Sequence, residues 1–112
     1  MSETCYKIDS YSVEFNAVDR KGSRTRWGDR VLKIYSEGRE VAKAVFSNQI
    51  SQIPEPYIAD GVIHYFAHAD QLSEILIMLN GRHEAFISWR PIYDPKESGD
   101  GDAVFIFKDM ER

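Results

Sequence analysis

The sequence predicts an α+β fold, in which a curled, mainly antiparallel sheet of about six strands packs against one amphipathic helix. Several short segments alternate apolar and polar residues with a period of two, and a single segment has the helical period. In chain order the elements are β-β-β-β-α-β-β. With 112 residues, of which 43% are hydrophobic and 29% charged, the chain suits one domain over residues 1–112 with its own core.

Alternation of apolar and polar residues predicts the strands. Tyr11, Val13, Phe15 and Ala17 form the first, and an opposite phase before them indicates a bulge near 9–10. The other strands are predicted at 31–35, 41–46, 61–66, 85–89 and 103–107.

Glycine and proline residues predict the connections between these strands. Glu37-Gly38 joins two of them in a hairpin, in which Gly38 supplies the positive φ. Pro54 and Pro56 disfavour both a helix interior and a central strand, so residues 47–60 are predicted to be an extended connection.

The helix is predicted from Gln71 to Asn80. Its apolar residues follow the i, i+3, i+4, i+7 spacing of a stripe that faces a core. They are Leu72, Ile75, Leu76 and Leu79. Asp70 is a suitable N-cap residue because its carboxylate can accept a backbone hydrogen bond, and Gly81 is a suitable residue just past the C-terminus.

Cysteine content and hydropathy bear on the cellular compartment. Cys5 is the only cysteine, so no disulfide within the chain is expected. The N-terminus has no apolar signal region, and the longest purely apolar run, Ile75–Leu79, is too short to cross a membrane. These features favour a cytoplasmic protein without a membrane partner. No motif implies a cofactor, and none is specific enough to name a family.

A basic loop is the first candidate binding surface. The net charge is −4, yet residues 19–33 contain six basic and two acidic residues, a net of +4. The candidate residues are Arg20, Lys21, Arg24, Arg26, Trp27 and Arg30. Clustered arginines beside a tryptophan suit single-stranded nucleic acid, through phosphate contacts and base stacking. An acidic protein partner would suit the same surface. The alternative without a partner is a solvated loop in which Trp27 folds onto the core.

The histidines are the second candidate site. His64 and His68 are four residues apart, a spacing that binds zinc when both lie on one helix. Residues 61–66 instead favour a strand, which would separate the two by about 13 Å. No metal site is therefore expected, and no catalytic residue is assigned. His64, His68 and Trp89 line a pocket only if the fold brings them together, in which case the protein would be a small enzyme or ligand carrier.

The aromatic residues predict a further contact surface. One helix covers only part of one sheet face, yet the aromatic residues of the strands divide between both faces. Either a second subunit covers the second face or the sheet closes around a small apolar ligand. The leading hypothesis is a non-enzymatic binding or adaptor domain that forms a homodimer. The alternatives are single-stranded nucleic-acid binding through the basic loop, and a small enzyme or carrier with a cavity between helix and sheet.

Overall fold

The computed structural model of the chain describes residues 4–15, 30–47, 54–91 and 101–109. These residues form one helix and eight strands. The elements are β1 Thr4–Lys7, β2 Ser10–Phe15, β3 Arg30–Ser36, β4 Arg39–Ser47, β5 Tyr57–Ala59, β6 Val62–His68, α1 Asp70–Leu79, β7 His83–Pro91 and β8 Gly101–Asp109.

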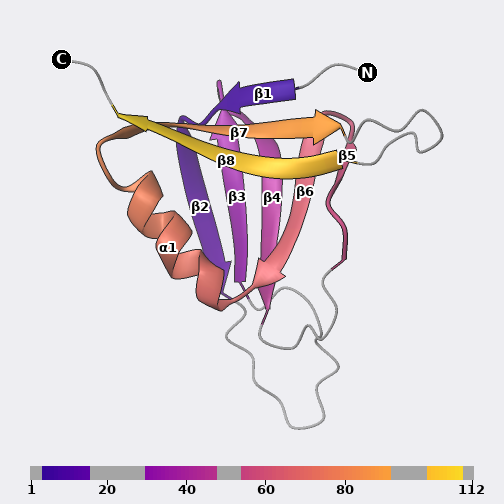
Figure 1. Cartoon of the computed structure of the whole chain (residues 1–112), viewed down its shortest axis with the longest axis horizontal. Coiled ribbons are helices and arrows are strands. Elements are labelled where there is room, and N and C mark those ends of the chain that lie inside the picture. Colours follow the sequence, from indigo (N-terminus) through magenta and orange to yellow (C-terminus); the bar gives the residue numbers. More distant parts are fainter. Residues whose placement is uncertain (1–3, 16–29, 48–53, 92–100, 110–112) are drawn as a thin grey trace, which may run out of the picture.

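The strands form two sheets, so the expected single sheet of about six strands does not occur. One sheet has the order β1-β7-β8 and the other the order β2-β3-β4-β6-β5. All pairs are antiparallel except β4 with β6, which are parallel. Figure 1 shows the smaller sheet running across the larger one, on the same side of it as α1. The α+β class and the predominance of antiparallel pairs are confirmed.

A corner at residues 8 and 9 creates the second sheet. The N–H of Ile8 donates to the carbonyl of Ala85 in β7 at 2.8 Å, and the N–H of Asp9 donates to that of Tyr35 in β3 at 2.9 Å. Two consecutive residues therefore bond to different sheets, as happens where a strand bends from one packed sheet into another. The reversal of phase in the sequence marks this corner, where β1 ends and β2 begins.

The strand β5 lies within the segment predicted as an extended connection. It pairs with β6 through a turn at Asp60 and Gly61, whose φ angles are +53° and +78°. Two consecutive positive φ angles are typical of the type I′ hairpin turn, for which Asp-Gly is a preferred sequence. The expected hairpin between β3 and β4 is confirmed, with φ angles of +52° at Glu37 and +82° at Gly38.

The start of α1 differs from the prediction that Asp70 is its N-cap. Ala69 occupies that position with helical angles, φ −61° and ψ −29°, and no side chain caps the helix. The strand β6 continues to His68, and the N–H of Ala69 donates to the carbonyl of Ser47 at 3.2 Å. The chain therefore turns directly from strand into helix. Asp70 lies in the first turn, where its negative charge interacts favourably with the helix dipole.

The end of α1 is held by Asn80. Its Nδ2 donates to the carbonyl of Leu76 at 2.9 Å, and its Oδ1 accepts from the hydroxyl of Tyr11 in β2 at 2.7 Å. Gly81 follows as predicted, but its φ is not positive. Glycine is instead favoured here for a steric reason, because a Cβ at this position would lie 2.8 Å from the ring of His83.

The core lies between the two sheets and α1. Its largest fully buried side chains come from both sheets: Trp89, Phe46, Leu32, Ile34, Ile63 and Ile87. A Cβ at Gly101 would lie 2.5 Å from the Trp89 ring, so glycine permits this close packing of β8 on the indole. The smaller sheet thus covers part of the inner face that α1 leaves open, whereas the sequence suggested a second subunit for the face opposite the helix. Among the described residues, no helix has the length and hydrophobicity that a membrane crossing requires.

We predict that Tyr11 and Asn80 contribute to stability as a coupled pair, through the hydrogen bond between their side chains. Asn80→Ala should lower the free energy of unfolding by about 1 kcal/mol and Tyr11→Phe by about 0.5 kcal/mol, since this bond is exposed. The double variant should lose less than the sum, which chemical denaturation of all four proteins measures. Strictly additive losses would contradict the coupling.

Candidate functional site

The candidate site is the outer face of the five-stranded sheet, opposite the core. Alternate residues of β3, β4 and β6 point inward and are buried, and those between them are half-buried. No described helix or strand packs on this outer face, because α1 and the smaller sheet lie on the other side (Figure 1). Its side chains are therefore accessible to a partner as far as the described residues are concerned.

One row of polar and aromatic side chains crosses this face. Strand pairing sets Ser12 opposite Lys33, Lys33 opposite Lys43, Lys43 opposite His64, and His64 opposite Tyr57. We call these five residues the central row. Neighbouring strands lie about 4.8 Å apart, so each side chain of the row is within reach of the next.

Two lysines occupy the middle of the central row. Like charges directly opposite each other on a sheet are unfavourable. Glu14 relieves part of this repulsion, since its carboxylate lies 3.1 Å from Lys33 Nζ and raises the pKa of Lys33. Lys43 forms no salt bridge with any described residue. The row thus contains a positive charge without a close counter-ion in the described structure.

His64 stacks on Tyr57 at the end of the row. The two ring centroids are 4.4 Å apart and the rings are inclined by only 10°. Burial lowers the pKa of His64 below its ordinary value of 6.5, and the positive charge of Lys43 lowers it further, while Glu40 acts in the opposite direction. At neutral pH the imidazole is therefore uncharged and presents an aromatic ring.

Phe66 extends the aromatic end of the site. Its ring centroid lies 6.2 Å from that of Tyr57, with an interplanar angle of 31°. Tyr57 is 45% exposed, so its ring is open to solvent although it contacts two others. The outer face therefore combines an aromatic cluster on β5 and β6 with lysines on β3 and β4.

Most of the predicted basic loop lies outside the described residues. This applies to Arg20, Lys21, Arg24, Arg26 and Trp27. Arg30, the last candidate of that loop, begins β3, and its guanidinium carbon lies 6.0 Å from the centroid of the Phe15 ring at the end of β2. Arg30 and Phe15 thus form a cation–π pair at the point where both strands meet the loop.

The three residues considered for a shared pocket lie apart. His64 is on the outer face, and His68 is exposed at the end of β6. Trp89 is 1% exposed in the core, and its indole N–H has no acceptor among the described residues. Within the described part of the chain, no three His, Cys, Asp or Glu side chains gather as a metal site would require.

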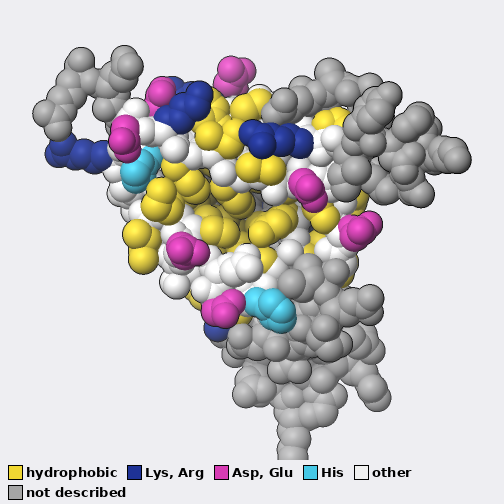
Figure 2. Space-filling model, viewed as in Figure 1, with side chains coloured by type: hydrophobic (Ala, Val, Ile, Leu, Met, Phe, Trp, Pro, Cys, Tyr) yellow, Lys and Arg dark blue, Asp and Glu magenta, His cyan; other side chains and the backbone are white. Residues whose placement is uncertain are grey.

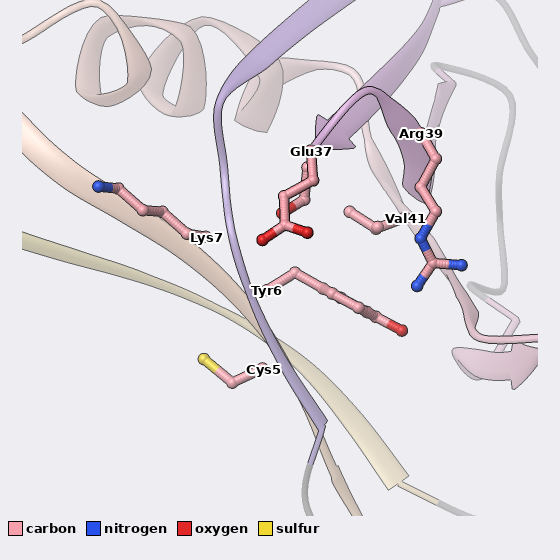
Figure 3. A pocket seen from close by; sticks show the side chains of 7 residues that line it. Cys5, Tyr6, Lys7, Glu37, Arg39 and Val41 are labelled. Atoms are coloured by element: carbon pink, nitrogen blue, oxygen red, sulfur yellow. The ribbon is translucent and has the colours of Figure 1, made fainter.

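A shallow cavity of about 190 Å³ lies elsewhere, between β1 and the β3–β4 hairpin. The Arg39 guanidinium carbon is 5.8 Å from the centroid of the Tyr6 ring, while Cys5 and Lys7 point away from that ring (Figure 3). Ligand pockets are usually about 300–1,000 Å³. This cavity is smaller, and no histidine lines it to activate the Cys5 thiol.

Hydrophobic side chains gather on the face that carries α1 and β8 (Figure 2). Tyr65 and Phe105 pack edge to face with centroids 6.2 Å apart, and Phe105 stacks on Phe107 at 6.1 Å. Ile77 of α1 is 70% exposed. This surface is apolar and differs from the charged and aromatic outer face.

Comparison with known proteins identifies no relative. Neither a protein-family model, nor a curated protein, nor a solved structure matches this chain. Among the described residues, the central row offers the clearest combination of charge and geometry.

Sequence reasoning identified one member of the central row, His64. Ser12, Lys33 and Lys43 sit on strands whose alternation indicates which residues point outward, whereas Tyr57 lies on β5, which is too short to show alternation. The missing information was the strand order. Only the arrangement β2-β3-β4-β6-β5 aligns Ser12, Lys33, Lys43, His64 and Tyr57.

We predict that the pKa of His64 responds in opposite directions to two neighbouring charges. Lys43→Gln removes a positive charge and should raise this pKa, whereas Glu40→Gln removes a negative charge and should lower it. An NMR titration of the His64 imidazole measures both shifts. Identical titrations in the two variants would contradict the predicted electrostatic environment.

The same shift predicts how His64 affects stability. The unfolded chain takes up the proton first as the pH falls below about 6.5, because the folded-state pKa is lower. The contribution of His64 to stability is therefore complete above that pH and declines as the pH falls toward its folded-state pKa.

Proposed function

We propose that this protein is a binding domain that captures an anionic ligand on the outer face of its five-stranded sheet. The observation that supports this proposal is the direct opposition of Lys33 and Lys43 in the middle of the central row. Like charges directly opposite each other on a sheet are unfavourable, and an anion bound between the two lysines would interact favourably with both ammonium groups.

The surroundings of the two lysines also favour an anion. Ser12 at one end of the row supplies a hydroxyl donor, and the neutral His64 at the other supplies a ring N–H. Arg30 begins β3, the strand that carries Lys33. An open sheet face suits capture of a ligand better than chemistry, which requires a site that excludes water.

We predict that inorganic pyrophosphate binds to the central row. In a backbone-amide NMR titration, the largest shifts should fall on Lys33, Lys43 and His64, because the anion would contact their side chains. Lys43→Gln should weaken binding at least about fivefold, which corresponds to loss of one charge-assisted hydrogen bond.

Lys108→Gln is the matched control, since Lys108 lies on β8 of the other sheet and its ammonium sits 5.3 Å from the Phe86 ring. It should leave pyrophosphate binding unchanged. Equal loss of binding in the two variants, or shifts spread over all lysines, would overturn the proposal.

Self-association is a second candidate property, and the hydrophobic surface around α1 and β8 favours it (Figure 2). Ile77 on α1 is 70% exposed, and large exposed apolar side chains are typical of contact surfaces. Since the outer face is separate from this surface, a homodimer would leave the central row free.

We predict that light scattering will detect a homodimer with twice the chain mass of 12.9 kDa. Ile77→Glu should shift the equilibrium toward the monomer, because the new charge would be buried in the contact. A 12.9 kDa species at every concentration up to the millimolar range would contradict self-association.

A further inference from the structure

We infer that the anionic ligand of the outer face is a single-stranded nucleic acid whose bases stack on Tyr57 and His64 while its phosphates contact Lys43 and Lys33. This inference rests on the proposed function and names the chemical class of the ligand. It follows from the side-by-side placement of an aromatic surface and a pair of lysines along one row.

The aromatic part of the site suits unpaired bases. Tyr57 and His64 are nearly parallel, and Tyr57 is on the edge strand β5, where its ring is partly open to solvent. Phe66 stands beside them on the same face. Flat aromatic rings on an open sheet are a common means of binding single strands, because every base has a face that stacks.

The charged part of the site suits the sugar–phosphate backbone. Lys43 lies one strand away from His64, and Lys33 one strand further, so positive charge begins next to the stacking surface. Of these two lysines, only Lys33 has a close counter-ion among the described residues, which is Glu14. A chain that crosses the strands along the central row would therefore place a base and neighbouring phosphates on suitable partners.

Glu40 is the acidic residue that opposes this ligand. It lies on β4 opposite Tyr35, and it favours the charged forms of both His64 and Lys33. Because His64 is neutral at pH 7, acidification would add a positive charge to the row. Binding should therefore strengthen as the pH falls toward the folded-state pKa of His64, which lies below 6.5.

An acidic peptide is the competing ligand, and the rings distinguish the two. Carboxylates would pair with the lysines, but they would place no planar group on the solvent-exposed part of the Tyr57 ring. A nucleic acid uses both halves of the row. The contribution of the bases is therefore the property to measure.

The test compares oligonucleotides with and without bases. Fluorescence anisotropy would measure binding of a labelled oligothymidylate of about 12 nucleotides and of an abasic strand of equal length and charge, at low and moderate salt. The base-containing strand should bind roughly 5- to 150-fold more tightly for a single stacked base. Tyr57→Ala should abolish this preference, and Tyr57→Phe, which keeps the ring, should retain it.

Lys43→Gln should weaken both strands and reduce the slope of log affinity against log salt by about 0.7. Equal binding of the two strands, still dependent on Lys43, would overturn the nucleic-acid inference and leave the anion-binding proposal intact. Tighter binding of a polyglutamate peptide than of the oligothymidylate would also overturn it. Absence of binding to both strands and to pyrophosphate would overturn both proposals.

Discussion

The structure depends on the corner at Ile8 and Asp9, where two consecutive backbone N–H groups donate to different sheets. This corner fixes how the smaller sheet lies over the larger one, so that Ile87 and Trp89 meet Ile34 and Ile63 in one core. Because the smaller sheet and α1 both occupy the inner side, the described residues on the other side of the larger sheet are half-buried or exposed. The position of the candidate site is a consequence of this packing.

That outer side carries two like charges on neighbouring strands. Lys33 and Lys43 lie opposite each other, and Lys43 also lowers the pKa of His64. Glu14 neutralises one ammonium, and the other lacks a close counter-ion among the described residues. Surfaces selected only for stability place opposite charges on facing strands. The binding role that we propose for the central row would account for the departure from that pattern.

Much of the fold could be predicted from the sequence because its signals are local. The stripe from Leu72 to Leu79 identified α1, and alternation located most strands. Three-residue β5 was missed because it is too short to show alternation, although Asp60-Gly61 is a strong hairpin signal. The division into two sheets depends on contacts between residues far apart in the chain, such as Thr4 with Trp89. No local pattern encodes those contacts.

The candidate site could be predicted only in part for the same reason. His64 attracted attention because of its spacing from His68, but its partners in the structure are Tyr57 and Lys43, which come from other strands. Of the candidates in the basic loop, which the sequence emphasised, only Arg30 belongs to the described residues. The candidate role of this loop therefore remains a sequence-based prediction.

One long-range bond links the N-terminal strand to the aromatic end of the site. The hydroxyl of Tyr6 in β1 donates to the carbonyl of Gly61 at 2.8 Å, within the turn that joins β5 to β6. Edge strands of three residues open readily on their own. The hydrogen bond of Tyr6 therefore couples the local unfolding of β5 to that of β1. Detachment of β1 would break this bond and make Tyr57, on the opposite face, more mobile. Amide exchange in these two segments would then occur as one cooperative unit, although they belong to different sheets.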